Sequence, residues 1–117
     1  PPPGVPGLET SLPLLLTAVQ DRRLTLERLI ELMALNPRRI YQLPAQPDTL
    51  IEVDPQTRYP ITNEALHTRC GWSPFAGQTV SGWVRRVVLR GQTVFEATEP
   101  GAPGKILARP GYGRMIP

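Results

Sequence analysis

The chain has 117 residues, 40% of them hydrophobic, and 13 Lys and Arg against 10 Asp and Glu give it a net charge of +3. This hydrophobic content argues against a wholly disordered chain, and basic residues that do not alternate with aromatic ones argue against a nucleic-acid partner. Cys70 is the single cysteine, so no internal disulfide can form and a cytoplasmic location is expected. Pro13 and Thr17 interrupt the one apolar run, so no membrane span is expected, and no basic segment precedes the run, so no signal peptide is expected.

The first 44 residues predict a loop followed by helices. The stretch PPPGVPG at residues 1–7 is rich in Pro and Gly, and Thr10 or Ser11 can cap a helix that carries Pro13 in its first turn. Thr25 offers a second N-cap. Apolar residues then recur at helical spacing in both segments: Leu12, Leu15, Leu16 and Val19 in the first, and Leu26, Leu29, Ile30 and Met33 in the second.

Asn36-Pro37 predicts a break in the second helix. Proline inside a helix removes a backbone donor and clashes with the preceding turn, whereas at a helix start it costs nothing. We therefore expect a short third helix that runs from this pair to Tyr41, and Leu43-Pro44 then closes the helical part.

From Ala45 onward the pattern changes to strands. Residues 49–53 predict a short strand that ends at Asp54-Pro55. Residues 79–89 and 92–96 are rich in Val, Trp and Phe, and Arg90-Gly91 between them indicates a hairpin in which Gly91 supplies the turn conformation. The tail from Pro100 is expected to be a loop.

These elements do not predict a self-sufficient fold. The strands are too few for a closed sandwich, and three helices cannot cover the remaining apolar surface. We therefore expect the chain to be the C-terminal piece of a longer protein that supplies the rest of both layers.

Few side chains in the chain carry chemistry. His67 and Cys70 lie at i and i+3 but lack two further metal ligands, so a loop histidine and a half-buried thiol are expected instead. Glu9 and Thr10 are expected to cap the first helix and compensate its dipole, in preference to contacting a substrate. The remaining expectations are solvated carboxylates at Asp48, Glu52 and Asp54, an outward hairpin face at Arg85, Arg86 and Arg90, and a core filled by Trp72, Phe75 and Trp83.

The order of several motifs resembles a known family. PPPGVPGLETSLPLLLTAV is followed by LTLERLIELMALNPRRIYQLP, then by CGWSPFAGQTVSGWVRRVVLRGQTVF and a closing PGYGR. This order resembles the C-terminal part of dihydroorotase, an amidohydrolase-superfamily enzyme of de novo pyrimidine (UMP) synthesis, including the dihydroorotase domain of multifunctional pyrimidine proteins. NP-x-x-I and SPF-x-G occur across amidohydrolases, whereas PG-x-PGLET followed by LPLLLTAV is much narrower.

The resemblance implies an α/β fold, in which a metal-dependent (β/α)8 barrel stands beside a small β-sandwich built from both chain ends. Residues 1–44 would be the loop after the eighth barrel strand and the last helices. Residues 45–117 would be the C-terminal share of the sandwich.

The resemblance also implies a zinc-dependent dihydroorotase that interconverts N-carbamoyl-L-aspartate and dihydroorotate, and that is a homo-oligomer at full length. The zinc ligands and the catalytic Asp of the family would lie upstream, so this chain would carry no catalytic or metal residue and would be inactive alone. Its site residues would be Pro3 and Gly4, which correspond to a pair that contacts the pyrimidine ring through its backbone. A non-catalytic scaffold domain of a multienzyme chain, and a dihydropyrimidinase or hydantoinase, remain alternatives.

Overall fold

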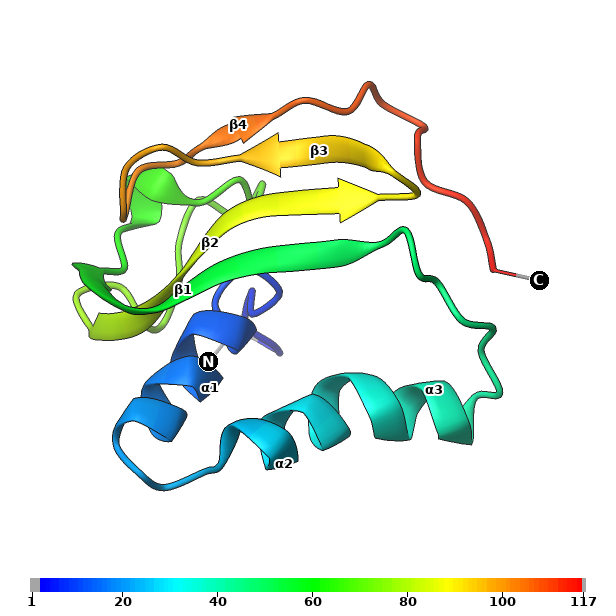
Figure 1. The fold of residues 1–117 in the computed structure, drawn as a ribbon. Helices are drawn as coiled ribbons and strands as arrows, with labels where there is room; N and C mark the ends of the chain where they lie inside the picture. Colours follow the sequence, from blue (N-terminus) through cyan, green and yellow to red (C-terminus); the bar gives the residue numbers. More distant parts are fainter. Residues whose placement is uncertain (1–2, 117) are drawn as a thin grey trace.

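A computed structural model describes residues 3–116, so Pro1 and Pro2 of the predicted opening loop and Pro117 of the tail lie outside the described residues. Helices come first and strands follow, and four antiparallel strands form one sheet in the order β1-β2-β3-β4 (Figure 1). This confirms a mixed α/β chain. The helices are α1 (Ser11–Gln20), α2 (Leu26–Ile30) and α3 (Asn36–Ile40), and the strands are β1 (Leu50–Pro60), β2 (Thr79–Leu89), β3 (Gln92–Glu96) and β4 (Lys105–Ile106). No helix within residues 3–116 combines the length and apolar character that crossing a membrane requires.

The short helix predicted to begin at Asn36-Pro37 is confirmed as α3, but the predicted break before it is wrong. A π-helical segment, η1 (Glu31–Leu35), joins α2 to α3, and the chain stays helical through the proline (Figure 1). The N–H of Asn36 bonds to the carbonyl of Glu31, five residues earlier. A widened turn of this kind accommodates the proline, because it loosens the α-helical turn with which the ring of Pro37 would clash.

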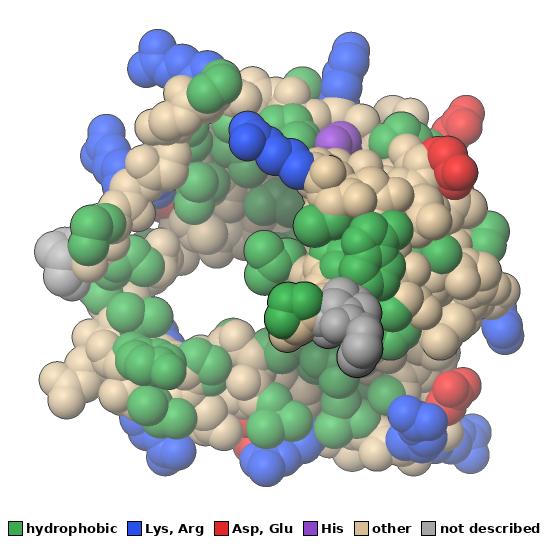
Figure 2. All heavy atoms as spheres, turned by 180° about the vertical axis from the view of Figure 1, so that it is seen from behind, with side chains coloured by type: hydrophobic (Ala, Val, Ile, Leu, Met, Phe, Trp, Pro, Cys, Tyr) green, Lys and Arg blue, Asp and Glu red, His purple; other side chains and the backbone are tan. Residues whose placement is uncertain are grey.

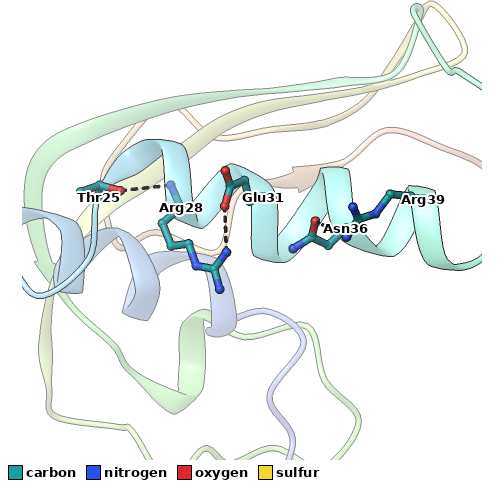
Figure 3. Close-up of polar contacts among 5 residues, drawn as sticks. All are labelled: Thr25, Arg28, Glu31, Asn36 and Arg39. Carbon is teal, nitrogen blue, oxygen red and sulfur yellow. Dashed lines mark hydrogen bonds and ion pairs between the residues drawn. The ribbon is translucent and has the colours of Figure 1, made fainter.

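The segments α2, η1 and α3 form one continuous helix, called the long helix below. Polar side chains support it along one side (Figure 3). The predicted cap at Thr25 is confirmed, since its hydroxyl accepts a hydrogen bond from the N–H of Arg28 at 3.1 Å. The guanidinium of Arg28 then pairs with the carboxylate of Glu31 at 2.8 Å. One α-turn further on, Arg39 donates to the side-chain oxygen of Asn36 at 3.4 Å.

The start of α1 is built differently from the expectation. Thr10 occupies the N-cap position, but its side chain accepts no capping hydrogen bond. The hydroxyls of Thr10 and Ser11 instead donate to the carbonyl of Gly7, and the N–H of Ser11 bonds to the same carbonyl. The helix start is therefore tied backward to the opening loop.

The β2–β3 hairpin confirms the sequence prediction at both of its strands. Arg90 and Gly91 have φ of 50° and 79°, the two positive values that define a type I′ turn. The preceding loop supports the turn, because the N–H of Arg90 bonds to the hydroxyl of Thr49 and that of Gly91 to the carbonyl of Asp48.

Strand β1 does not end at Asp54-Pro55 as predicted. It continues to Pro60, and a register shift between Asp54 and Arg58 absorbs the interruption. The carboxylate of Asp54 accepts hydrogen bonds from the hydroxyl of Thr57 and from the N–H groups of Gln56 and Thr57. These bonds replace ladder bonds, so the proline bends the strand without terminating it.

Helix α1 packs directly on β2. A Cβ on Gly82, whose φ is 123°, would lie 2.7 Å from Cβ of Leu16, so only glycine lets the two elements approach this closely. Next to this contact, the hydroxyl of Thr17 accepts a hydrogen bond from the N–H of Ser81 at 2.9 Å. Both Leu16 and Ser81 are buried.

The core is smaller than the sequence predicted. Its buried hydrophobic residues are Leu16, Leu29, Ile61, Val80, Val88 and Ala97. Trp72, Phe75 and Trp83 are only half-buried, so the expectation that they fill the core is wrong for the described chain. The face shown in Figure 2 is hollowed, and hydrophobic side chains border the opening. Apolar residues of the long helix remain exposed, namely Leu26, Ile30, Leu32, Met33, Leu35 and Ile40.

The contact between Leu16 and Gly82 predicts an asymmetry between two glycine substitutions. Gly77 also has a positive φ, of 91°, but a Cβ there meets nothing within 4 Å. Gly77→Ala should therefore cost about 1 kcal/mol in the free energy of unfolding through backbone strain alone. Gly82→Ala should cost about 1–3 kcal/mol more, because it also displaces α1. Urea unfolding of both variants measures the difference, and equal losses would contradict a steric role for Gly82.

The hydroxyl of Thr17 should matter independently of its methyl group. Thr17→Val keeps the shape of the side chain but leaves the N–H of the buried Ser81 without its acceptor, which should cost about 1–3 kcal/mol. Thr17→Ser keeps the hydroxyl and serves as the control. A Val variant no less stable than the Ser variant in the same unfolding measurement would show that the hydrogen bond contributes nothing.

Candidate functional site

Pro3 and Gly4 lie exposed in the opening loop. Apart from its two chain neighbours, no described residue has an atom within 4 Å of the position that a Cβ on Gly4 would occupy, and Gly4 is not among the glycines of positive φ. The backbone conformation of residue 4 therefore does not by itself require glycine. Open space beside its backbone remains, and a ligand could approach there without contacting a side chain of residue 4.

Glu9 does not cap α1, because its carboxylate is bonded to the backbone of another segment. Its carboxylate accepts hydrogen bonds from the N–H of His67, at 2.9 Å and 3.1 Å, and from the N–H of Thr68 at 2.9 Å. Consecutive backbone N–H groups that converge on one anion form a small concave anion site, which here holds a carboxylate of the same chain. The predicted capping role of Glu9 is thus replaced by a contact across 58 residues.

His67 continues this connection toward the sheet. Its Nε2 lies 2.5 Å from the carbonyl oxygen of Pro103, and because a carbonyl can only accept, the proton must be on Nε2. The ring also meets Phe95 of β3 edge-on, with centroids 6.2 Å apart. The His67 side chain is therefore held between the sheet and the turn before β4.

Two grooves adjoin these residues. One, of about 450 Å³, lies between residues 5–10 of the opening loop and the segment that carries Leu66, His67, Thr68 and Cys70. The other, of about 340 Å³, lies between the start of α1 and one face of the sheet and is mostly apolar, with Trp83 and Phe95 in its lining. Glu9 borders both, whereas Pro3 and Gly4 border neither.

The described residues do not offer a metal centre. Within residues 3–116 no three His, Cys, Asp or Glu side chains come together in a way that could hold an ion. Cys70 is exposed, and not half-buried as expected. A catalytic zinc needs three protein ligands, so this part of the chain does not fit one.

The carboxylates of β1 have structural partners. Glu52 pairs with Arg86 of β2, and a hydrogen bond from that guanidinium lowers the pKa of Glu52. For Asp54, the hydroxyl of Thr57 is the main cause of a lowered pKa, followed by two backbone N–H groups. Asp48 is exposed. The expectation of solvated carboxylates holds for Asp48, whereas Glu52 and Asp54 are bonded to neighbouring groups.

Arg90 differs from the outward-facing arginine that the sequence suggested. It is half-buried, its guanidinium lies 4.5 Å from the ring centroid of Tyr112, and it donates to the carbonyl of that tyrosine. The hydroxyl of Tyr112 donates in turn to the carbonyl of Leu89 at 3.1 Å. The PGYGR motif is thereby fastened to the tip of the hairpin.

Sequence reasoning missed several contacts that connect distant segments, among them Glu9 to residues 67 and 68, Thr17 to Ser81, and Arg90 to Tyr112. None has a local signal, because each depends on the tertiary fold. The one available hint was Glu9 in the narrow motif PG-x-PGLET, where a charged residue follows a Pro- and Gly-rich loop.

Comparison with known proteins gives close relatives over almost the whole chain. It is 54% identical over 113 residues to multifunctional protein pyr1-3 of Dictyostelium discoideum, covering 97% of this chain and 5% of that protein. It is 47% identical to multifunctional protein CAD of Squalus acanthias, covering 99% and 5%. It is also 35% identical to the dihydroorotase of Pyrococcus furiosus, covering 97% of this chain and 27% of that enzyme. No family model matches the chain.

Solved structures point to the same group of proteins. The L-hydantoinase (dihydropyrimidinase) of Arthrobacter aurescens is 29% identical with a TM-score of 0.82, over 97% of this chain and 26% of that one. The inactive dihydroorotase-like domain of the Chaetomium thermophilum CAD-like multifunctional protein is 35% identical with a TM-score of 0.66, over 75% and 25%. The chain thus spans about a quarter of the dihydroorotase it matches and a twentieth of the multifunctional proteins. The resemblance noted in the sequence is confirmed: the homologues of this chain are dihydroorotases and the multifunctional proteins pyr1-3 and CAD, and the chain corresponds to one segment of them.

Proposed function

We propose that this chain is the C-terminal segment of a zinc-dependent dihydroorotase that interconverts N-carbamoyl-L-aspartate and dihydroorotate in pyrimidine synthesis. The observation that carries the proposal is the 35% identity to a dihydroorotase over 97% of the chain. We also propose that the full-length enzyme is cytoplasmic and forms homo-oligomers.

Within that protein, residues 1–44 would end a (β/α)8 barrel and residues 45–117 would form the C-terminal share of a β-sandwich. Two features support this division. The long helix leaves apolar residues such as Leu32 and Leu35 exposed, as expected for a helix that packs on further structure. The four-stranded sheet likewise leaves an apolar groove along one face, beside Trp83 and Phe95.

The role proposed for this chain is to form one wall of the substrate site. The backbone of Pro3 and Gly4 would contact the pyrimidine ring, and the open space beside Gly4 is compatible with that approach. Zinc would be held outside this chain, because its described residues bring no suitable ligands together. When bound, zinc would supply an activated water and polarise the cyclic amide carbonyl. Residues 3–116 would bind and orient the substrate and would transfer no proton.

Two alternatives each have a specific observation in their favour. The structural relative from Chaetomium thermophilum is an inactive dihydroorotase-like domain, which favours a non-catalytic scaffold. The L-hydantoinase gives a TM-score of 0.82, which favours a dihydropyrimidinase or hydantoinase. The chain is 35% identical to a dihydroorotase and 29% identical to the hydantoinase, and this leads us to prefer a dihydroorotase over a hydantoinase.

Activity of the full-length protein decides among these readings. We expect it to contain zinc and to hydrolyse dihydroorotate, and we expect the 117-residue chain alone to do neither. Assays with dihydroorotate and dihydrouracil, together with metal analysis of the same preparation, measure this. Faster turnover of dihydrouracil would favour the hydantoinase reading, and a folded protein with no turnover of either substrate would favour a scaffold.

Gly4→Ala tests the proposed contact in the full-length enzyme. The fold itself should tolerate the methyl group, because no described atom outside the two chain neighbours lies within 4 Å of it and the backbone does not need a positive φ. A methyl group that intrudes on the substrate should lower kcat/KM about ten- to a hundredfold, which corresponds to about 1.4–2.8 kcal/mol.

Gly113→Ala is the matched control, since a Cβ at this tail position also meets nothing within 4 Å. Zinc content and melting temperature should stay unchanged in both variants. Normal turnover by Gly4→Ala with full zinc would show that the opening loop is only a connector.

A further inference from the structure

We propose that Glu9 is a positioning residue, whose carboxylate fixes the opening loop so that Pro3 and Gly4 are held ready for substrate. This inference rests on the proposed function, because it concerns the loop that would contact the ring. It adds a residue for which the sequence suggested only helix capping.

The contact between the Glu9 carboxylate and the backbone N–H groups of His67 and Thr68, called the clamp below, has a specific geometry. Both carboxylate oxygens of Glu9 accept from the N–H of His67, and one of them also accepts from the N–H of Thr68, at distances of 2.9–3.1 Å. Hydrogen bonds to an ionised acceptor are stronger than neutral ones, and two donors on adjacent residues fix the direction of the carboxylate as well as its distance.

The far side of the clamp is itself fixed. His67 donates from Nε2 to the carbonyl of Pro103, and its ring contacts Phe95. Phe95 pairs with Ile106 in the β3–β4 ladder. A continuous path therefore runs from the sheet through His67 to Glu9, five residues after Gly4.

Apolar packing does not replace this clamp. Leu8, next to Glu9, is 99% exposed, and Val5, next to Gly4, is 57% exposed. The carbonyl of Gly7 is bonded to the start of α1, which fixes the loop to its own helix only. Glu9 supplies the connection to a segment 58 residues away in the sequence, on the other side of the groove.

This arrangement predicts a particular kinetic effect. A loop that is already fixed costs less conformational entropy when substrate binds, and a loop that is only partly in the competent position lowers the apparent affinity by that fraction. Loss of the clamp should therefore raise KM, by about tenfold if only a tenth of the loops remain in place. It should leave kcat nearly unchanged, because no reacting group is displaced.

The test uses Glu9→Gln and Glu9→Ala in the full-length protein. The Gln side chain keeps the size and one carbonyl acceptor but not the charge or the second acceptor, so its effect should be intermediate. Glu64→Gln is the matched control, because Glu64 is an exposed carboxylate in the short 3-10 helix (Asn63–Ala65) near the same segment. The measurements are kcat and KM for dihydroorotate, together with backbone amide exchange over residues 3–10 and 66–69.

We expect Glu9→Ala to raise KM about tenfold with kcat within about twofold of wild type, and to accelerate amide exchange in both segments. Glu64→Gln should change neither. Unchanged KM in Glu9→Ala would overturn the positioning role, whether or not kcat and the melting temperature fall. A wild-type protein without dihydroorotate turnover would overturn the proposed function instead. Amide exchange tests the clamp even in that case, because unchanged exchange in Glu9→Ala would show that Glu9 does not fix the loop.

Discussion

The seating of helix α1 on strand β2 is the constraint on which the rest of the structure depends. Leu16 lies over Gly82 at a distance that a Cβ would forbid, and Thr17 bonds to Ser81 beside it. The opening loop leads directly into α1, so this contact sets where the end of the loop lies relative to the sheet. The carboxylate of Glu9, two residues before α1, meets the backbone of residues 67 and 68 from this position.

Local chemistry made much of the fold predictable from the sequence. The β2–β3 hairpin follows from two β-rich runs around Arg90-Gly91, and the cap at Thr25 follows from a hydroxyl before an apolar stripe. Both depend on neighbours only a few residues apart. Proline was the main source of error. Pro37 predicted the end of a helix and Pro55 the end of a strand. In each case the backbone changed its hydrogen-bonding pattern, and the helix or strand continued.

The residues of the candidate site stay a prediction, and the contacts around them could not be predicted from the sequence. A family resemblance pointed to Pro3 and Gly4, and no periodicity or spacing could have done so. The contacts that hold the loop join residues 58 positions apart and use backbone N–H groups, which every residue except proline possesses. Composition therefore carries no trace of them. The same holds for Tyr112, whose ring covers Arg90 from a tail that reads as an unstructured loop.

The π-helical segment between α2 and α3 has a consequence for how the long helix can be covered. An α-helix turns about 100° per residue, so a turn that holds one extra residue shifts the phase of everything after it by about that angle. Apolar residues before η1, such as Leu26, and after it, such as Ile40, therefore do not continue a single straight stripe. Two differently oriented neighbours can then share one helix, each in contact with its own half, and a deletion within Glu31–Leu35 would turn one half away from its neighbour.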